Sequence, residues 1–208
     1  AIITGHPGLA AISELPAREE TGPLEVVFFS ERIADDVAEG VNPDFGFDET
    51  TACRLVIEAA AEAARQGFPV NLTVKFHPYN DPASFRTRLG AFEEPAGLTV
   101  SWIEERMPVA EVVAGTDLVT GMVSIAMVES ALMGRPVVSV QPGLCRENIF
   151  IPGLRGYADT LTEPARAFTR LVELMTEPDA RREATERLAG FRRSIRPATG
   201  SPVRDWMI

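Results

Sequence analysis

Runs of β-branched and aromatic apolar residues alternate along this chain with segments of helical spacing, and short connections join them. The clearest run, LEVVFFS at residues 24–30, lies between Gly22-Pro23 and a charged segment, so we predict a strand that is buried on both faces. Alternation of this kind favours right-handed βαβ crossovers. The sequence therefore predicts an α/β domain built on a doubly wound, mostly parallel sheet.

The remaining elements follow the same alternation. After a loop, a helix is expected from Thr50 to a stop at Gly67, with Thr50 or Thr51 as its N-cap. A shorter helix begins with Asp81 as N-cap and Pro82 at its first position. Further strands are predicted at residues 69–78, 98–102, 116–121, 136–143 and 157–161, and further helices at 107–115 and 124–134.

Residues 162–194 predict two arginine-rich amphipathic helices, separated near Glu177-Pro178. We expect them to pack across the sheet with their charges facing outward. Because the chain begins with Ala1 in a strand-like segment, we also expect that a further part precedes it.

Composition narrows the classes of partner. The chain has 30 acidic and 20 basic residues and a formal net charge of −10, which repels nucleic acid and anionic lipid. No apolar run approaches the roughly 20 residues that span a bilayer. Cys53 and Cys145 have no partner at metal-ligand spacing, so we expect free thiols in a reducing cytoplasm. We therefore expect a cytoplasmic protein with no transmembrane segment and no nucleic-acid partner.

Polar and charged residues follow the predicted strands. In an open parallel sheet, ligands bind beyond the carboxyl ends of the strands, so these residues are the candidates for a site. They are Ser30, Glu31 and Arg32 after the first strand, Lys75, His77 and Pro78 after the second, Gly121 to Ser124 after the fourth, and Gln141, Pro142 and Gly143 after the fifth. Basic and hydroxyl groups gathered in an acidic protein indicate an anion site.

Lys75 is the only lysine of the chain, and His77 is one of its two histidines. Their two-residue spacing places both side chains on one face of the predicted strand. A charged residue in a buried run calls for a functional explanation, and anion binding provides one. The alternative is that His77, which precedes a proline, is a turn residue or a hydrogen-bonded core group.

Ser124 is expected to be the N-cap of the helix that follows it. Its hydroxyl and the free amides of Ile125 and Ala126 would then point out of the helix start, where the macrodipole adds partial positive charge. Such a helix end binds phosphate well. The alternative is that Ser124 caps the helix and does nothing else.

Glu129 lies five residues further on, in an otherwise apolar helix. A buried carboxylate needs partners, and the two hydroxyls of a ribose could supply them. An arginine from the C-terminal helices could equally pair with Glu129.

Other polar residues are expected to have structural roles. We interpret Arg32 as a surface or cap-pairing group and His6 as a hinge or turn residue. The acid pairs Asp35-Asp36 and Glu93-Glu94 lack metal-ligand spacing, so we predict no metal site. Cys145 has no visible base beside it and is not interpreted as a nucleophile.

The order KFHP followed by SIAMVESALMGRPV resembles the C-terminal, nucleotide-binding half of GT-B fold glycosyltransferases. The chain is most similar to their bacterial capsule and wall-polymer group, which comprises polysialyltransferase-like enzymes, CDP-glycerol glycerophosphotransferases and capsule polysaccharide synthesis proteins. UDP-N-acetylglucosamine 2-epimerase shares this half-fold. The segments ITGHPGLAAI and VVFFSERIADD resemble the start of that half, and the similarity covers roughly residues 2–195.

The resemblance implies a Rossmann-like fold and assigns roles to particular residues. His77 would contact the donor phosphate as a catalytic residue, with the catalytic Lys75 nearby. Ser124 and the amides that follow it, beginning with Ile125, would bind phosphate or a sugar acid, and Glu129 would hold the ribose. We also expect donor contacts from Ser30, Arg32, Ser130 and Gln141. The family group often has a second serine where this chain has Ile125.

The resemblance further implies the organisation of the protein. Residues 1–22 would be an interdomain segment and linker, 23–161 the nucleotide-sugar-binding domain, and 162–208 the C-terminal helices and tail that complete it. The donor would be a CMP-, CDP- or UDP-linked sugar, used without a metal or another cofactor. An N-terminal acceptor-binding domain, absent from this chain, would supply the catalytic base and allow peripheral membrane association.

The expected function is therefore donor binding in a metal-independent glycosyltransferase for bacterial surface polysaccharide. A UDP-N-acetylglucosamine 2-epimerase-like half-domain is one alternative, because its acid and base groups would also come mainly from the other half. A non-catalytic binding or assembly domain is another.

Overall fold

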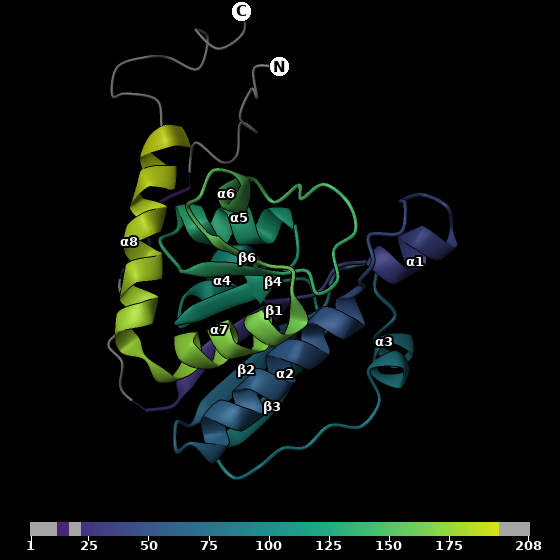
Figure 1. Cartoon of the computed structure of the whole chain (residues 1–208), viewed down its shortest axis with the longest axis horizontal. Coiled ribbons are helices and arrows are strands. Elements are labelled where there is room, and N and C mark those ends of the chain that lie inside the picture. The colour runs from purple at the N-terminus through teal and green to yellow at the C-terminus, as the bar shows by residue number, and fades with distance from the viewer. Residues whose placement is uncertain (1–11, 17–21, 196–208) are drawn as a thin grey trace, which may run out of the picture.

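The computed structural model describes residues 12–16 and 22–195 (Figure 1). These residues form one sheet of six parallel strands in the order β3-β2-β1-β4-β5-β6. The strands are β1 (Leu24–Phe29), β2 (Val70–Lys75), β3 (Leu98–Ile103), β4 (Leu118–Gly121), β5 (Val137–Val140) and β6 (Asp159–Leu161). The predicted doubly wound α/β fold is confirmed.

Helices cover both faces of the sheet, as parallel strands require. They are α1 (Ile33–Ala38), α2 (Glu49–Arg65), α3 (Pro82–Leu89), α4 (Val109–Val113), α5 (Ile125–Leu132), α6 (Ile151–Leu154), α7 (Pro164–Thr176) and α8 (Pro178–Ile195). One core lies between the sheet and α2 and α7, and a second lies between the sheet and α4, α5 and α8. Figure 1 shows α2 and α7 side by side on their face.

Small residues allow the layers of the first core to approach closely. The alanines at positions 52, 59, 60 and 63 of α2 are fully buried, between the sheet and α7. In the same core, larger side chains from the strands, such as Phe28, Leu72 and Leu118, fill the space that the alanines leave. A helix with a flat alanine face can lie close to a sheet without leaving voids, which keeps the packing dense.

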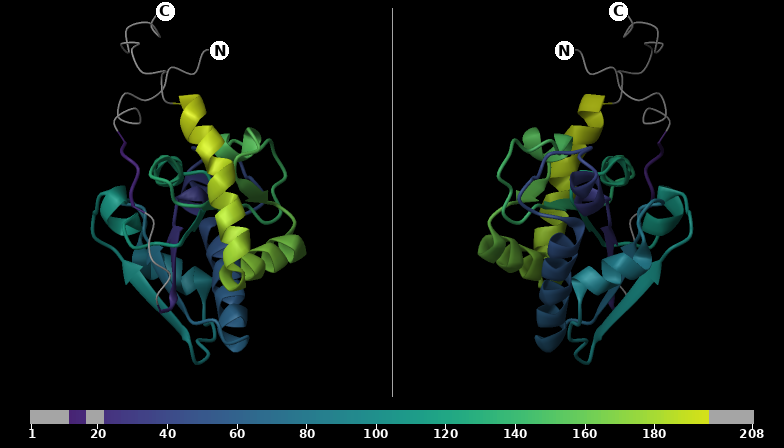
Figure 2. Two further views of the ribbon diagram at one scale, coloured as in Figure 1. Left: turned by 90° about the vertical axis from the view of Figure 1, so that its left-hand side faces the viewer. Right: turned by 90° about the vertical axis from the view of Figure 1, so that its right-hand side faces the viewer.

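Helix α8 joins the two faces. It contacts α7 and α5. Figure 1 shows it along one edge of the molecule, and in the left view of Figure 2 it lies in front. Its residues Pro178 and Arg181 adjoin the segments that precede β4 and β5. The carboxyl ends of the strands, at the opposite end of the sheet, are therefore left open.

The expectation that the arginines of α7 and α8 face outward is wrong for part of the set. Arg170 and Arg187 both turn inward to Asp159 of β6, at 2.9 and 2.8 Å. Arg181 is buried and donates to the carbonyl of Leu174 at 2.8 Å. A carboxylate on the sheet edge and a free carbonyl at a helix end provide partners that the sequence pattern does not reveal.

The predicted start of α2 needs a correction. The N-cap is Asp48, and neither Thr50 nor Thr51 caps the helix. One oxygen of Asp48 accepts hydrogen bonds from the amides of Thr50 and Thr51 at 2.9 and 2.7 Å and from both threonine hydroxyls at 2.8 Å. A carboxylate satisfies more of the free donors at a helix start than a hydroxyl can.

Other predicted boundaries are confirmed. Asp81 caps α3 with Pro82 as its first residue, and Ser124 caps α5. Helix α7 ends with Glu177 as its C-cap, directly before α8. Two short helices were missed: α6, and α1 where a loop was expected. Arg32 stabilises α1 by pairing with Asp35, Asp36 and Glu39.

The remaining sequence predictions concern the cysteines, the terminal segments and membrane-spanning helices. Both cysteines are free, Cys53 buried and Cys145 exposed, as predicted. His6 lies outside the described residues, and the domain boundaries stay predictions. In the described part of the chain, no helix is both long enough and apolar enough to cross a membrane.

The cap of α2 predicts a measurable loss of stability. Replacing Asp48 with alanine removes the acceptor from two amides and two hydroxyls and should lower the free energy of unfolding by about 1–2 kcal/mol. Asp48→Asn, which keeps an acceptor, should lower it by much less. The side chain of Asp81 accepts from one amide, so the loss of stability in Asp81→Ala should lie between those of Asp48→Ala and Asp48→Asn. Denaturant unfolding measures all three, and equal stability of Asp48→Ala and wild type would contradict the assignment.

Candidate functional site

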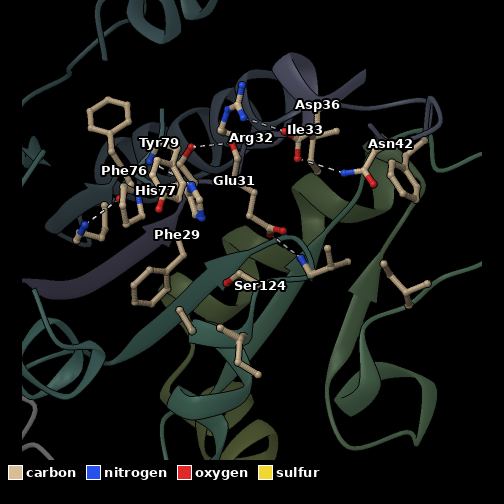
Figure 3. A pocket seen from close by; sticks show the side chains of 18 of the residues that line it. Phe29, Glu31, Arg32, Ile33, Asp36, Asn42, Phe76, His77, Tyr79 and Ser124 are labelled. Carbon is tan, nitrogen blue, oxygen red and sulfur yellow. Dashed lines mark hydrogen bonds and ion pairs between the residues drawn. The ribbon is translucent and has the colours of Figure 1, made fainter. Parts of the chain in front are cut away.

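A cavity of about 780 Å³ lies at the carboxyl ends of β1, β2, β4 and β5 (Figure 3). Its volume falls within the range of small-molecule sites in proteins. The strand order reverses between β1 and β4, because the chain leaves β1 toward β2 on one side and returns to β4 on the other. Ligands of open α/β sheets bind at this switch point.

Most of the predicted donor-binding residues line this cavity. They are Ser30, Arg32, Lys75, His77, Ser124, Ile125 and Gln141. They come from four different strand ends, so the sheet brings them together although they are far apart in sequence. The cavity also contains aromatic and aliphatic side chains, among them Phe45, Phe47 and Ile149.

Glu129 and Ser130 are not among the residues that line the cavity. Both lie more than a turn from the start of α5, on a helix that leads away from the cavity. The hydroxyl of Ser130 is buried and donates to the carbonyl of Ala126 at 2.6 Å. Glu129 is partly buried. Their predicted contacts with a ribose and a donor stay predictions.

Lys75 is the last residue of β2, and His77 lies beyond the strand. The sequence predicted that strand alternation places both side chains on one face, and this reason is wrong because His77 lies outside the strand. Both residues nevertheless line the cavity. Lys75 is buried, and its ammonium donates to the carbonyl of Phe76 at 2.8 Å. Burial lowers the pKa of Lys75. An ammonium group has three donors, so two remain for a ligand.

The ring of His77 has a defined tautomer. The amide of Tyr79 donates to its Nδ1 at 3.3 Å, so the neutral ring carries its proton on Nε2. Burial lowers the pKa of His77, and the nearby charges of Arg32 and Lys75 lower it further, against the opposing effect of Asp36. At neutral pH His77 is therefore a neutral donor through Nε2.

Asn80 positions this part of the cavity, and sequence reasoning missed it. Its Oδ1 accepts from the hydroxyl of Ser30 at 2.9 Å and from the amide of His77 at 3.0 Å, while its Nδ2 donates to the carbonyl of Glu31 at 3.1 Å. One amide side chain thereby fixes the ends of β1 and β2 relative to each other. An asparagine after a His-Pro turn is a signal for such a role.

Glu31, which the sequence placed among the residues after the first strand without a role of its own, lines the cavity. It is partly buried, and its Oε1 accepts from the amide of Val123 at 2.7 Å (Figure 3). Burial raises the pKa of its carboxyl to about 7, although the amides of Val123, Met122 and Ser124 oppose that shift. A carboxyl that is half-protonated at neutral pH in a cavity is a functional candidate.

The turn between β4 and α5 passes close to β1. A Cβ on Gly121 would lie 3.0 Å from the carbonyl of Phe29 and 2.8 Å from the sulfur of Met127. Only glycine permits this approach. It brings the amides of Met122 to Ser124 next to Glu31, and Val123 and Ser124 line the cavity.

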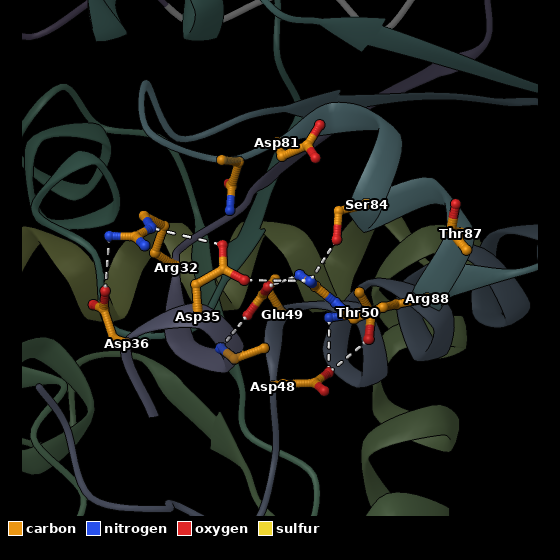
Figure 4. A network of polar contacts seen from close by, with 12 residues as sticks. Arg32, Asp35, Asp36, Asp48, Glu49, Thr50, Asp81, Ser84, Thr87 and Arg88 are labelled. Atoms are coloured by element: carbon orange, nitrogen blue, oxygen red, sulfur yellow. Dashed lines mark hydrogen bonds and ion pairs between the residues drawn. The ribbon is translucent and has the colours of Figure 1, made fainter. Parts of the chain in front are cut away.

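A polar network holds α1 against α2 and α3 (Figure 4). Glu49 is fully buried and accepts from the amide of Ala34 at 2.9 Å and from Arg88 at 2.6 Å. Arg88 also contacts Asp35 at 3.3 Å and Ser84 at 3.0 Å. The network fixes the segment that carries Glu31 and Arg32. Arg32 lines the cavity and also pairs with the carboxylates of α1, as its cap-pairing interpretation predicted.

Among residues 12–16 and 22–195, no group of three or more His, Cys, Asp or Glu side chains is arranged to hold a metal ion.

The chain matches no protein-family model and no curated protein. Solved structures do match. The crystal structure of Acinetobacter baumannii MurG matches with a TM-score of 0.55 and 14% identity over 86% of this chain and 48% of its own. TarM matches with a TM-score of 0.55 and 13% identity over 94% and 36%. A putative UDP-N-acetylglucosamine 2-epimerase from Listeria monocytogenes matches with a TM-score of 0.51 and 11% identity over 89% of this chain and 47% of its own.

The fold is that of one half of a GT-B glycosyltransferase. At these identities the likeness shows the fold alone. The chain spans less than half the length of each of the three proteins. The capsule and wall-polymer subgroup stays a prediction from the sequence motifs.

The raised pKa of Glu31 predicts a pH-dependent cost to stability. The folded protein holds this proton up to about pH 7, whereas the unfolded chain releases it near 4.5, so stability falls as the pH rises through that window. Relative to wild type, Glu31→Gln should gain about 3 kcal/mol between pH 4 and pH 8.

Urea unfolding across that pH range measures the gain. Glu94→Gln, at an exposed position, is the matched control and should show no such trend. A constant difference between Glu31→Gln and wild type would contradict the assignment.

Proposed function

We propose that this chain is the donor-binding half of a glycosyltransferase and that the cavity holds the phosphate of a nucleotide-linked sugar. One observation carries the proposal: Lys75, His77 and the first amides of α5 meet at the switch point of a GT-B half-fold. Each supplies hydrogen-bond donors, and such donors suit an anionic group.

The chemistry follows from where charge develops. In glycosyl transfer the bond between the sugar C1 and the phosphate oxygen breaks, and the leaving phosphate gains negative charge. Donors that are already in place stabilise that charge without having to reorganise. The Nε2 proton of neutral His77 and the ammonium of Lys75 would do so. Since the pKa of His77 is lowered, its ring is neutral before the ligand binds, and we assign it the role of a hydrogen-bond donor through Nε2.

The finer parts of the proposal rest on the sequence motifs. We propose a CMP-, CDP- or UDP-linked donor, transfer without a divalent ion, and a product that belongs to a bacterial surface polysaccharide made on the cytoplasmic side. The acceptor and the catalytic base would come from an N-terminal domain, through which the enzyme could contact a membrane. The donor contacts proposed for Ser30, Arg32, Ser124, Ile125 and Gln141 are supported by their place in the cavity.

A UDP-N-acetylglucosamine 2-epimerase is the second candidate. The similarity of the fold to the Listeria epimerase supports it. The two functions share a phosphate site and differ in the reaction that the complete protein performs, so donor binding alone does not separate them. Assays of the full-length protein for epimerised nucleotide-sugar and for transfer to an acceptor would do so.

Nucleotide binding tests the proposal directly. Calorimetric titration with CMP, CDP, UDP and UDP-N-acetylglucosamine should show saturable binding of at least one, unchanged by EDTA. His77→Ala should weaken it roughly 10- to 100-fold, the equivalent of about 1.5–3 kcal/mol for a hydrogen bond to a charged group.

His77→Gln is the matched control, because its amide can place a donor near the position of Nε2, and it should retain most of the affinity. Equal binding by wild type and His77→Ala would remove His77 from the site. No binding of any nucleotide by folded protein would favour a non-catalytic binding or assembly domain.

A further inference from the structure

Glu31 places an acidic group at the point where the proposed function requires an anion. Its side chain extends from the end of β1 to the turn before α5, and its Oε1 accepts from the amide of Val123 (Figure 3). Val123 and Ser124 belong to the same turn and also line the cavity. A ligand phosphate drawn to this turn would therefore meet the carboxyl of Glu31.

The two protonation states of Glu31 would affect such a ligand in opposite ways. An ionised carboxylate repels a phosphate and can only accept hydrogen bonds. A neutral carboxylic acid can keep one oxygen on the amide of Val123 and donate its O–H to a phosphate oxygen. Burial favours the neutral form, and the pKa of about 7 makes both forms accessible at neutral pH.

We propose that Glu31 contacts the bound anion as a neutral carboxylic acid, so that binding of a phosphate-bearing ligand takes up one proton at this residue. The inference rests on the proposed function for the identity of the ligand. It adds a ligand-contacting residue to the site and makes donor affinity dependent on pH.

The charged surroundings of Glu31 are mixed. Glu49, at the start of α2, acts on Glu31 through its negative charge and raises the pKa further. Besides Glu31, the charged or titratable groups that line the same cavity are Arg32, Asp36, Lys75, His77, Tyr79, Arg106 and Glu147. The pKa of His77 is lowered and that of Glu31 is raised, so the Glu31→Gln variant, and not the pH alone, assigns a change of affinity with pH to Glu31.

A purely structural role is the rival explanation. The bond between Glu31 and Val123 could do no more than join the end of β1 to the turn before α5. In that case replacing Glu31 could change stability and overall affinity, but the pH dependence of binding would stay as in wild type.

The experiment measures affinity against pH for two probes, UDP-N-acetylglucosamine and inorganic sulfate. Neither changes charge between pH 6 and 8.5, so any slope belongs to the protein. If the neutral form alone binds, a pKa of about 7 predicts that wild-type affinity falls about 30-fold across this range. Glu31→Gln, which mimics the neutral acid, should vary less than about threefold.

Glu147→Gln is the matched control. Glu147 also lines the cavity and is exposed, and nothing places it on the amide of Val123. Its removal takes away the same charge and should leave the wild-type slope in place. An equal loss of slope in both variants would indicate a general charge effect and would overturn the specific role of Glu31.

The outcomes separate the two proposals. If UDP-N-acetylglucosamine binds wild type and Glu31→Gln with the same slope, the role of Glu31 is overturned and the proposed function stands. If sulfate binding shows the predicted slope but no nucleotide or nucleotide-sugar binds, Glu31 keeps its role and the proposed function fails. If neither probe binds at any pH, both proposals fail.

A second measurement covers the case in which Glu31→Gln does not fold. In the wild type, the amide ¹⁵N shift of Val123 should titrate with a midpoint near pH 7, because its acceptor is the carboxyl of Glu31. Saturating sulfate should move that midpoint upward by at least one pH unit. A midpoint that sulfate leaves unchanged would overturn the proposal.

Discussion

The parallel pairing of the six strands is the constraint on which the rest of the molecule depends. Each parallel connection must cross over the sheet, so helices cover both faces and the strands become buried on both sides. Between β1 and β4 the crossovers run to opposite faces, which leaves a cavity beyond the strand ends. The cavity is therefore a consequence of topology, and the sequence decides only what lines it.

What lines it is a set of polar groups held by backbone amides and carbonyls. Lys75 is bound to a neighbouring carbonyl, His77 to the amide of Tyr79, and Glu31 to the amide of Val123. Asn80 and Glu49 hold the segments that carry them. Burial shifts the pKa of each of the three groups in the direction that favours its neutral form, and the hydrogen bonds hold the three side chains in place before a ligand binds.

The sequence predicted the sheet because continuous apolar runs bounded by glycine and proline leave few alternatives. It also predicted most of the cavity, because residues after parallel strands must meet at one edge. It did not predict Asp48 as a cap, since the threonines beside it are also good caps, or α1, whose stability comes from ion pairs. The roles of Glu31 and Asn80 depend on partners 92 and 50 residues away, which no local pattern encodes.

The single lysine has a consequence for chemical probing. Because Lys75 is the only side-chain amine of the chain and lies in the cavity, an amine-selective acylating reagent would modify side chains at this one place. Its lowered pKa increases the fraction of free amine, while its burial restricts access to small reagents. The fold thereby provides a built-in covalent reporter of whether the cavity is occupied, without any engineered residue.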